Sequence, residues 1–246
     1  MTPAPVTIAG SGRAARLVIT CEHASPEVPA EYAGLGVPPE HLHDHIGWDI
    51  GAAAVTAELA RQLDAAAVLS PVSRLLVDCN RDLSDADLMP ADSCGVAIPG
   101  NARIEPAERD ERLRRFYAPY HDAVDATLAT HPEALLLSVH SFTPALHGRR
   151  RPFDVGVLFD AFDDLARELS EAVSAAGFAV RLNEPYSGLD GLIFSARAHG
   201  QRHGLRYVEL EINNRLLRSD AEARAVAGRL VDAVGALLPA ATSRPG

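Results

Sequence analysis

The sequence predicts a three-layer α/β sandwich in which helices cover both faces of a mixed, mostly parallel sheet. Short apolar segments alternate with helical patterns from residue 16 onward. Several of these segments are apolar at every position, as is typical of strands covered on both faces. The 246 residues, 47% of them hydrophobic, are enough to bury a large core without disulfide or metal cross-links. No stretch resembles an interdomain linker, so we expect one domain over 1–246 with flexible tails at 1–13 and 240–246.

Six apolar segments are predicted as strands: 17–20, 67–70, 75–77, 134–139, 155–159 and 207–212. Four helical segments lie between or after them: 50–63, 106–128, 162–176 and 220–238. The first helix is alanine-rich with apolar residues at helical spacing, and the second begins with Pro-Ala-Glu, which suits a first helical turn. Gly177 can cap the end of the third helix, and Ser219 can cap the start of the fourth.

The stretch 82–101 is rich in Asp, Ser, Pro and Gly and is predicted as a long loop. Loops of this length inside a compact domain tend to border a functional site.

Charge and composition exclude several classes of function. The net charge of −10 argues against nucleic acid or an anionic membrane as the main partner. No apolar run approaches the roughly 18 residues of a membrane span, and the first residues lack the apolar core of a secretory signal. The three cysteines, Cys21, Cys79 and Cys94, are an odd number in a chain without a predicted signal, which predicts reduced thiols, and their lack of CxxC spacing excludes a zinc ribbon. We therefore expect a cytoplasmic protein with a small-molecule substrate; the sequence leaves the oligomeric state open.

Polar side chains capable of chemistry gather where the predicted strands end. They are Glu22 and His23 after 17–20, residues 78–82 after 75–77, His140 and Ser141 after 134–139, and Glu209 and Glu211 within 207–212. Ligands of open α/β sheets bind beyond the carboxyl ends of the strands. If these strands are parallel, four separate segments deliver histidine, glutamate, asparagine and arginine to one edge.

His23 and His140 are candidate metal ligands, because a neutral imidazole after a buried strand can bind a metal through one nitrogen. Hydrolytic zinc requires two or three such ligands with an open fourth position. Either histidine could instead be a structural residue of the core. The acidic ligand is open: Glu22 should point away from His23 by strand alternation, and Asp49 could be a ligand or a helix N-cap.

Glu209 and Glu211 are two residues apart and should share one face of their strand. Two acids on a largely apolar strand are costly unless they are paired or bound to something. Either this is an edge strand whose polar face meets water or arginine, or one of the two is a general base that activates water.

Arginines could bind an anionic substrate, because guanidinium groups pair with a carboxylate through two parallel hydrogen bonds. Arg74 and Arg81 flank one predicted strand, and Asn80-Arg81 is expected to lie buried against the site. Arg149 and Arg151 belong to a run of three arginines that is more typical of a solvated loop.

Other signals are weaker. His41, His43 and His45 alternate in a polar stretch and are predicted to be mostly solvated. Cys21 could be a thiol nucleophile, but no helix N-terminus would lower its pKa. Ser141 lacks the GxSxG turn of serine hydrolases, and the absence of GxGxxG and P-loop motifs argues against nucleotide cofactors.

Seven blocks of the sequence resemble the N-formylglutamate amidohydrolase family, and they follow the family's order. They are 21–29 (CEHASPEVP), 47–52 (GWDIGA), 73–81 (SRLLVDCNR), 139–144 (VHSFTP), 154–158 (DVGVL), 183–188 (NEPYSG) and 209–214 (ELEINN). The resemblance implies an α/β fold similar to zinc carboxypeptidases, a bound divalent metal such as zinc, and hydrolysis of an N-acyl amide.

The resemblance also implies roles for individual residues. The metal ligands would be His23 and His140 with Asp49 or Glu22, and the general base would be Glu211, with Glu209 as the alternative. Substrate contacts would come from Asn80, Arg81, Arg74, Tyr186, Arg149 and Arg151, with Arg81 also serving catalysis.

The implied substrate is a small anionic N-acyl amino acid, with N-formyl-L-glutamate as the leading candidate, so the resemblance places the enzyme in histidine and amino-acid degradation. Three alternatives remain: another N-acyl substrate, a carboxylate-binding protein without turnover, and a metal-free hydrolase using Cys21.

Overall fold

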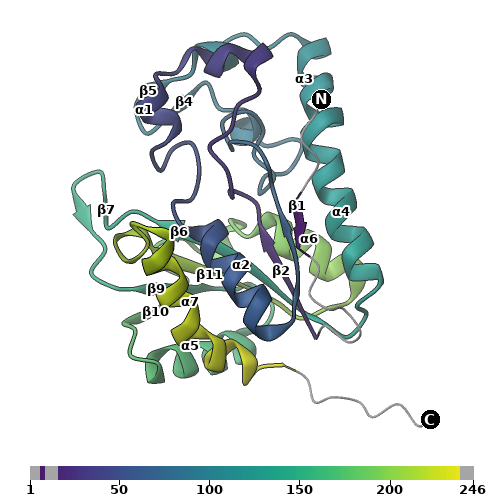
Figure 1. Ribbon diagram of the computed structural model, residues 1–246. Coiled ribbons are helices and arrows are strands. Elements are labelled where there is room, and N and C mark those ends of the chain that lie inside the picture. The colour runs from purple at the N-terminus through teal and green to yellow at the C-terminus, as the bar shows by residue number, and fades with distance from the viewer. Residues whose placement is uncertain (1–5, 9–15, 239–246) are drawn as a thin grey trace.

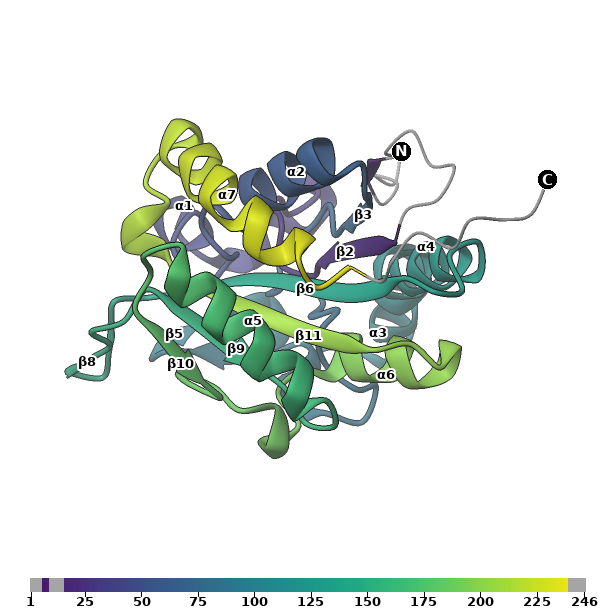
Figure 2. The same ribbon diagram turned by 90° about the horizontal axis from the view of Figure 1, so that it is seen from below.

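The computed structural model describes residues 6–8 and 16–238, and a seven-stranded sheet forms its centre (Figures 1 and 2). In spatial order the strands are β1 (Val6–Ile8), β3 (Ala66–Leu69), β2 (Leu17–Cys21), β6 (Leu135–Phe142), β11 (Tyr207–Asn213), β9 (Val155–Leu158) and β10 (Val180–Leu182). The four strands β3, β2, β6 and β11 are parallel, whereas β1 and β9 pair antiparallel with their inner neighbours. The sheet is therefore mixed and mostly parallel, as predicted.

Helices cover both faces of the sheet, which confirms the three-layer α/β sandwich. One face carries α2 (Ala52–Leu63), α5 (Asp163–Ala175) and α7 (Asp220–Gly235), which lie in front of the sheet in Figure 1. The other face carries α4 (Ala118–Ala129) and α6 (Phe194–His203). Alternate residues of β2 serve the two cores: Leu17 and Ile19 pack with α2 and α7, and Val18 packs with α4. No helix in the described part of the chain is long and apolar enough to span a membrane.

One continuous helix runs through α3 (Pro106–Arg112), a π-helical turn (Leu113–Tyr117) and α4, close to the predicted 106–128. Pro119 cannot donate a backbone hydrogen bond, and its ring would crowd the carbonyl four residues earlier in a regular helix. In the wider turn before it, the Ala118 amide donates to the Leu113 carbonyl. The π turn thus lets the helix continue past the proline.

One prediction about local structure was wrong. Residues 75–77 form a turn rather than a strand; their apolar character reflects burial in the core and not sheet pairing. Strand β1 falls inside the segment 1–13, which we predicted to be flexible. The other residues of that segment, apart from the three of β1, lie outside the described residues, as does the predicted tail 240–246.

Helix α6 and strand β10 were not predicted. The buried residues of α6 are Ser195, Ala196, His199 and Gly200, which are small or polar and so give no apolar stripe at helical spacing. Strand β10 is only three residues long, and an arginine occupies its centre.

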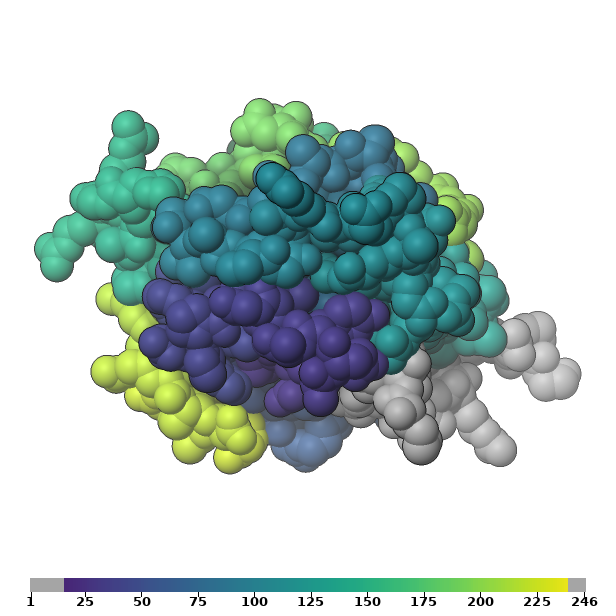
Figure 3. Space-filling model, turned by 90° about the horizontal axis from the view of Figure 1, so that it is seen from above, coloured from purple at the N-terminus to yellow at the C-terminus, as the bar shows by residue number. Residues whose placement is uncertain are grey.

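Loops and short elements gather beyond the carboxyl ends of β2, β6 and β11. They include α1 (Pro39–Leu42), the hairpin of β4 (Asp92–Ser93) and β5 (Val96–Ala97), and the hairpin of β7 (Ala145–Leu146) and β8 (Arg149–Arg150). Seen from above, the purple segment around α1 and the blue-teal segments that follow residue 80 cover this end, and the β7–β8 hairpin projects at the left (Figure 3).

The chain after β10 folds back over the sheet. Asn183 adopts a left-handed conformation with φ of 50°, and the Glu184 carbonyl oxygen then passes over Gly156 of β9. That oxygen lies 2.1 Å from the position that a Cβ at residue 156 would occupy, so only glycine fits there. The reversal brings Tyr186 to the same cavity as His140 at the end of β6.

Candidate metal centre and substrate cavity

A cavity of about 300 Å³ opens beyond the carboxyl ends of the parallel strands. As predicted, separate segments converge there: the ends of β2 and β6, strand β11, and the turn after residue 73. The polar lining includes His23, Asp49, Arg74, Asp78, Asn80, Arg81, His140, Tyr186, Glu209 and Glu211. The stretch 82–101 also contributes lining residues, so it borders this cavity.

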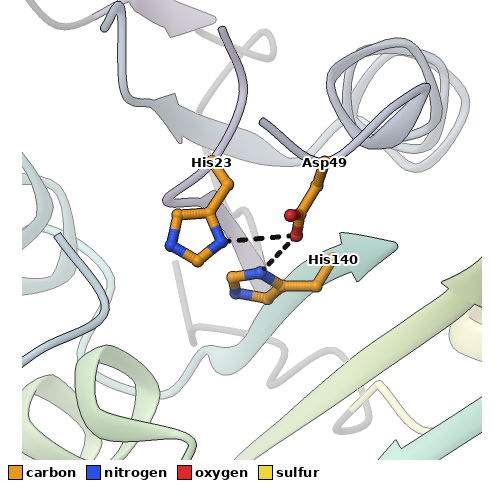
Figure 4. Close-up of side chains that lie close together, drawn as sticks. All are labelled: His23, Asp49 and His140. Atoms are coloured by element: carbon orange, nitrogen blue, oxygen red, sulfur yellow. Dashed lines mark hydrogen bonds and ion pairs between the residues drawn. The ribbon is translucent and has the colours of Figure 1, made fainter. Parts of the chain in front are cut away.

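His23, Asp49 and His140 converge at the inner end of this cavity (Figure 4). The Asp49 Oδ2 atom lies 2.8 Å from His140 Nδ1 and 3.4 Å from His23 Nδ1. All three side chains are buried. The Asp49 side chain does not cap α2, which begins after Gly51; instead its Oδ2 also accepts a hydrogen bond from the Ser141 amide.

The other ring nitrogen of each histidine faces a second carboxylate. His23 Nε2 lies 2.7 Å from Asp78 Oδ1, and His140 Nε2 lies 3.0 Å from Glu22 Oε2, although this second pair is not aligned as a hydrogen bond. Metal-binding histidines typically have this arrangement, with one nitrogen on the metal and the other on a carboxylate that orients the ring. Glu22 therefore lies at the opposite edge of His140 from Asp49.

The three converging residues fit a divalent metal ion. Tetrahedral zinc with bonds of about 2.0–2.2 Å separates its ligand atoms by about 3.3–3.6 Å. The 3.4 Å between His23 and Asp49 matches this spacing, and the 2.8 Å between His140 and Asp49 is the shorter spacing of a direct hydrogen bond. Two imidazoles and one carboxylate form the donor set of a catalytic site, which leaves a fourth position for water or substrate.

The acids around the histidines are held ionised. Burial by itself would raise the pKa of Asp49 and of Asp78. For Asp49, the charge of His23 and hydrogen bonds to His140 and His23 outweigh burial; for Asp78, the charges of His23 and Arg74 and a hydrogen bond to His23 do so, and both pKa values lie well below the usual range.

Glu209 and Glu211 point from β11 into the cavity, opposite the register positions of Ser138 and His140 on β6. Both are buried, and each has an Oε2 atom without a hydrogen-bond partner. Burial raises the pKa of Glu209 to about 7, and burial with the nearby charge of Asp49 raises the pKa of Glu211 well above its usual value. The edge-strand interpretation was wrong, because β11 lies between β6 and β9.

The arginines near the cavity differ in how many of their donors are already used. Arg74 donates to Asp78 Oδ2 at 2.9 Å and lies 3.6 Å from Asp49 Oδ1. Arg81 is half-buried rather than buried as expected, its nearest acid is Asp85 at 3.9 Å, and its buried Nε atom has no hydrogen-bond partner. Arg81 therefore retains donors for a substrate.

Asn80 lines the cavity, but its side chain is engaged with α6. Its Oδ1 atom accepts a hydrogen bond from the Ser195 amide at 2.9 Å, and its Nδ2 atom lies 3.4 Å from the Leu192 carbonyl. The Asn80 side chain thus fixes the start of α6 beside the site.

Tyr186 forms part of the cavity wall, and Arg151 supports it from behind. The Arg151 guanidinium lies 5.1 Å from the centre of the Tyr186 ring and 3.5 Å from its hydroxyl. Arg149 is exposed on the projecting β7–β8 hairpin. The structure therefore separates these two arginines, which the sequence had grouped in one run.

Sequence reasoning gave no role to several residues that line the cavity, Asp78 and His45 among them. Asp78 was visible at the end of a predicted strand but received no role. His45 was predicted to be solvated, yet it lines the cavity beside Ile46. Cys21 is fully buried, and burial raises the pKa of its thiol, so it is a poor nucleophile.

Comparisons with known proteins show what this sequence and this fold are similar to. The family model described as N-formylglutamate amidohydrolase matches residues 15–218. A solved structure of a gene product from Agrobacterium tumefaciens is 35% identical, with a TM-score of 0.90 over 96% of this chain and 94% of that one. An N-formylglutamate amidohydrolase from Ralstonia eutropha JMP134 shares the fold at 18% identity, with a TM-score of 0.76 over 95% and 98% of the two chains. No curated protein matches the sequence.

Proposed function

The chain belongs to the N-formylglutamate amidohydrolase family, and on this premise we propose that it is a metal-dependent hydrolase of N-formyl or N-acyl amino acids. N-formyl-L-glutamate is the leading substrate. One observation carries the metal dependence: two buried histidines converge with Asp49, and each faces a further carboxylate through its other nitrogen.

We assign His23, His140 and Asp49 to hold the ion, with zinc as the first candidate because this donor set is typical of catalytic zinc. Glu22 and Asp78 orient the two imidazoles and are not assigned as ligands. A divalent ion in this site supplies Lewis-acid activation of water and of the acyl carbonyl.

Glu211 is the proposed general base. It accepts a proton from the attacking water and returns it to the departing amine nitrogen. Its position supports this role: it lies across from His140 in the register of β11 and β6, lines the cavity, and has a carboxylate oxygen with no other partner. Glu209 lies two residues before Glu211 in β11, with its Oε2 atom 3.6 Å from His140 Nε2, and is the alternative base.

Arg81 is proposed to bind the α-carboxylate of the substrate, because it lines the cavity and retains unpaired donors. Arg74 and Asn80 line the same wall. The Arg74 guanidinium donates a hydrogen bond to Asp78, and Asn80 accepts one from the Ser195 amide of α6. Tyr186 closes the other side, and Arg151 behind it can attract a second carboxylate.

We further propose that the enzyme acts in the cytoplasm, since all three cysteines are free in the structure. By the same family premise it would release an amino acid in a degradative pathway such as that of histidine.

Metal content of the purified protein, measured together with formate release from N-formyl-L-glutamate, tests the proposed function. We expect about one zinc ion per chain, with turnover lost on chelation and restored by adding metal. Zinc without formate release would keep the centre and direct the search to other N-acyl amino acids. Protein that binds no divalent metal, yet gains thermal stability with N-acyl amino acids, would instead indicate a carboxylate-binding protein.

A further inference from the structure

Two tyrosines of the continuous helix formed by α3, the π turn and α4 contact residues of the cavity without lining it themselves. The Tyr120 hydroxyl donates to Glu22 Oε1 at 2.9 Å, and the Tyr117 hydroxyl donates to the backbone carbonyl of Arg81 at 2.8 Å. Both tyrosines are buried, and neither is among the residues that line the cavity. Each therefore reaches the site only through another residue.

The same helix is also anchored to the loop that borders the cavity, through Arg112 just before the π turn. Because a π turn closes after five residues, Arg112 and Tyr117 face the same side of the helix. Arg112 is buried and donates to Asn101 Oδ1 at 2.7 Å, which ties the helix to the end of the loop that borders the cavity. The helix is thus anchored just before the turn that presents Tyr117 to Arg81.

Glu22 is fixed from two directions. Tyr120 from α4 donates to one carboxylate oxygen, and the buried Ser138 hydroxyl from β6 donates to the other at 2.7 Å. That second oxygen is also the one that lies 3.0 Å from His140 Nε2. A change at Tyr120 must therefore reach His140 through the carboxylate of Glu22.

We propose that Tyr120 and Tyr117 are positioning residues with separate roles. Tyr120 orients His140 through Glu22 and so sets the affinity for the metal. Tyr117 fixes the backbone of Arg81 and so sets the affinity for the substrate. This inference rests on the proposed function and assigns to one helix the control of two different binding constants.

The test compares Tyr120→Phe with Tyr117→Phe, since each variant removes one hydroxyl from the same helix. Zinc affinity of the metal-free protein is measured by competition with a chromophoric chelator. The KM is then measured at saturating zinc with N-formyl-L-glutamate, or with the fastest of a panel of N-formyl amino acids.

Tyr120→Phe should weaken zinc binding about tenfold, at the lower end of the effects seen when an outer partner of a metal-binding histidine is lost. Its KM should stay within about twofold of wild type. Tyr117→Phe should give the reverse pattern, with unchanged zinc affinity and a KM raised about threefold to tenfold. Equal changes of both constants in both variants would indicate general loosening of the helix and would overturn the inference.

A second experiment uses the Glu22→Gln variant to test whether Tyr120 acts through Glu22. If Tyr120 acts through Glu22, Tyr120→Phe should weaken zinc binding no further in the Glu22→Gln background, whereas additive effects would contradict this route. Ser138→Ala, from a different element, should reproduce the zinc effect and covers the case in which Tyr120→Phe fails to fold. Wild-type protein that binds no divalent metal would overturn the proposed function as well, whereas wild-type zinc affinity in Tyr120→Phe would overturn this inference alone.

Discussion

The inner and outer halves of the cavity are built by different parts of the fold. The inner half comes from the sheet: His23 follows β2, His140 lies in β6 and Glu211 lies in β11, and all three are buried. The outer half comes from turns and loops, where Arg81 is half-buried. The proposed metal ligands and general base are thus attached to the core, while the groups proposed to select a substrate can vary with little change to the core.

The two halves also differ in how their charges are balanced. In the inner half, each imidazole lies between two carboxylates, so removal of one partner leaves a buried polar group unpaired, which is costly. In the outer half, Arg81 has one loose contact, to Asp85 at 3.9 Å, and partly exposed pairs of this kind contribute little to stability. We therefore expect inner substitutions to affect chemistry and metal affinity, and outer ones to affect substrate affinity without unfolding.

The largest effect is expected for Glu211→Gln. The amide keeps the size of the side chain but cannot accept the proton of the attacking water, so kcat should fall about 10³-fold. Zinc content should be unchanged, because Glu211 is not one of the proposed ligands. Glu209→Gln is the matched control on the same face of β11. A larger loss of kcat in Glu209→Gln than in Glu211→Gln would assign the base to Glu209.

Arg81→Ala should lower kcat/KM about 100-fold, equivalent to about 2.7 kcal/mol, because a charge-assisted contact to the substrate carboxylate is lost. Thermal unfolding should hardly change, since the guanidinium is loosely paired and partly exposed. Arg150→Ala, on the projecting hairpin, serves as the control with wild-type kinetics. Wild-type kinetics in Arg81→Ala would show that the outer half binds substrate through another residue.

Asp78→Asn should weaken zinc binding about 10- to 100-fold, because the carboxylate that orients His23 loses its charge. At saturating zinc the loss of kcat should be smaller than in Glu211→Gln. Chelator competition on the metal-free protein measures the change, with Asp85→Asn as a control for general loss of negative charge. Unchanged zinc affinity would mean that Asp78 serves mainly to hold Arg74.

The smallest effect on catalysis is expected for Cys21→Ala. Activity and its sensitivity to chelators should remain, because the buried thiol, whose pKa is raised, takes no part in the reaction. The free energy of unfolding should fall by about 1 kcal/mol, as is usual when a buried side chain is shortened. Loss of activity in a folded Cys21→Ala protein would favour the thiol mechanism instead.

The inner half could be predicted from the sequence to a large extent. Largely apolar segments identified β2, β6 and β11, and parallel pairing then placed His23, His140 and the two glutamates at one end of the sheet. In the structure Asp49 lies next to both histidines, and Glu22 contacts the other ring nitrogen of His140. The sequence left open which of these two acids is the metal ligand, and strand alternation indicated only that Glu22 points away from His23.

The outer half could not be predicted in the same way, because tertiary contacts and not periodicity determine it. The apolar residues 75–77 are buried in a turn, so an apolar run alone gave the wrong element. Helix α6 packs through small and polar residues, and Asn80, which holds its first turn, was interpreted as a substrate contact. Arg149 lies in strand β8 of the projecting hairpin, whereas Arg151 follows that strand and contacts Tyr186. The sequence gives no sign of this separation.

The width of the cavity depends on Gly156, a residue of β9 that does not line the cavity. A single methyl group at this position would meet the Glu184 carbonyl oxygen at 2.1 Å and would push the returning segment away from the sheet. Tyr186, two residues further along, would move with it. The distance between β11 and the wall that carries Tyr186 thus depends on the absence of a side chain at residue 156, so substitution of this glycine would reshape the cavity without replacing any residue proposed to act in the reaction.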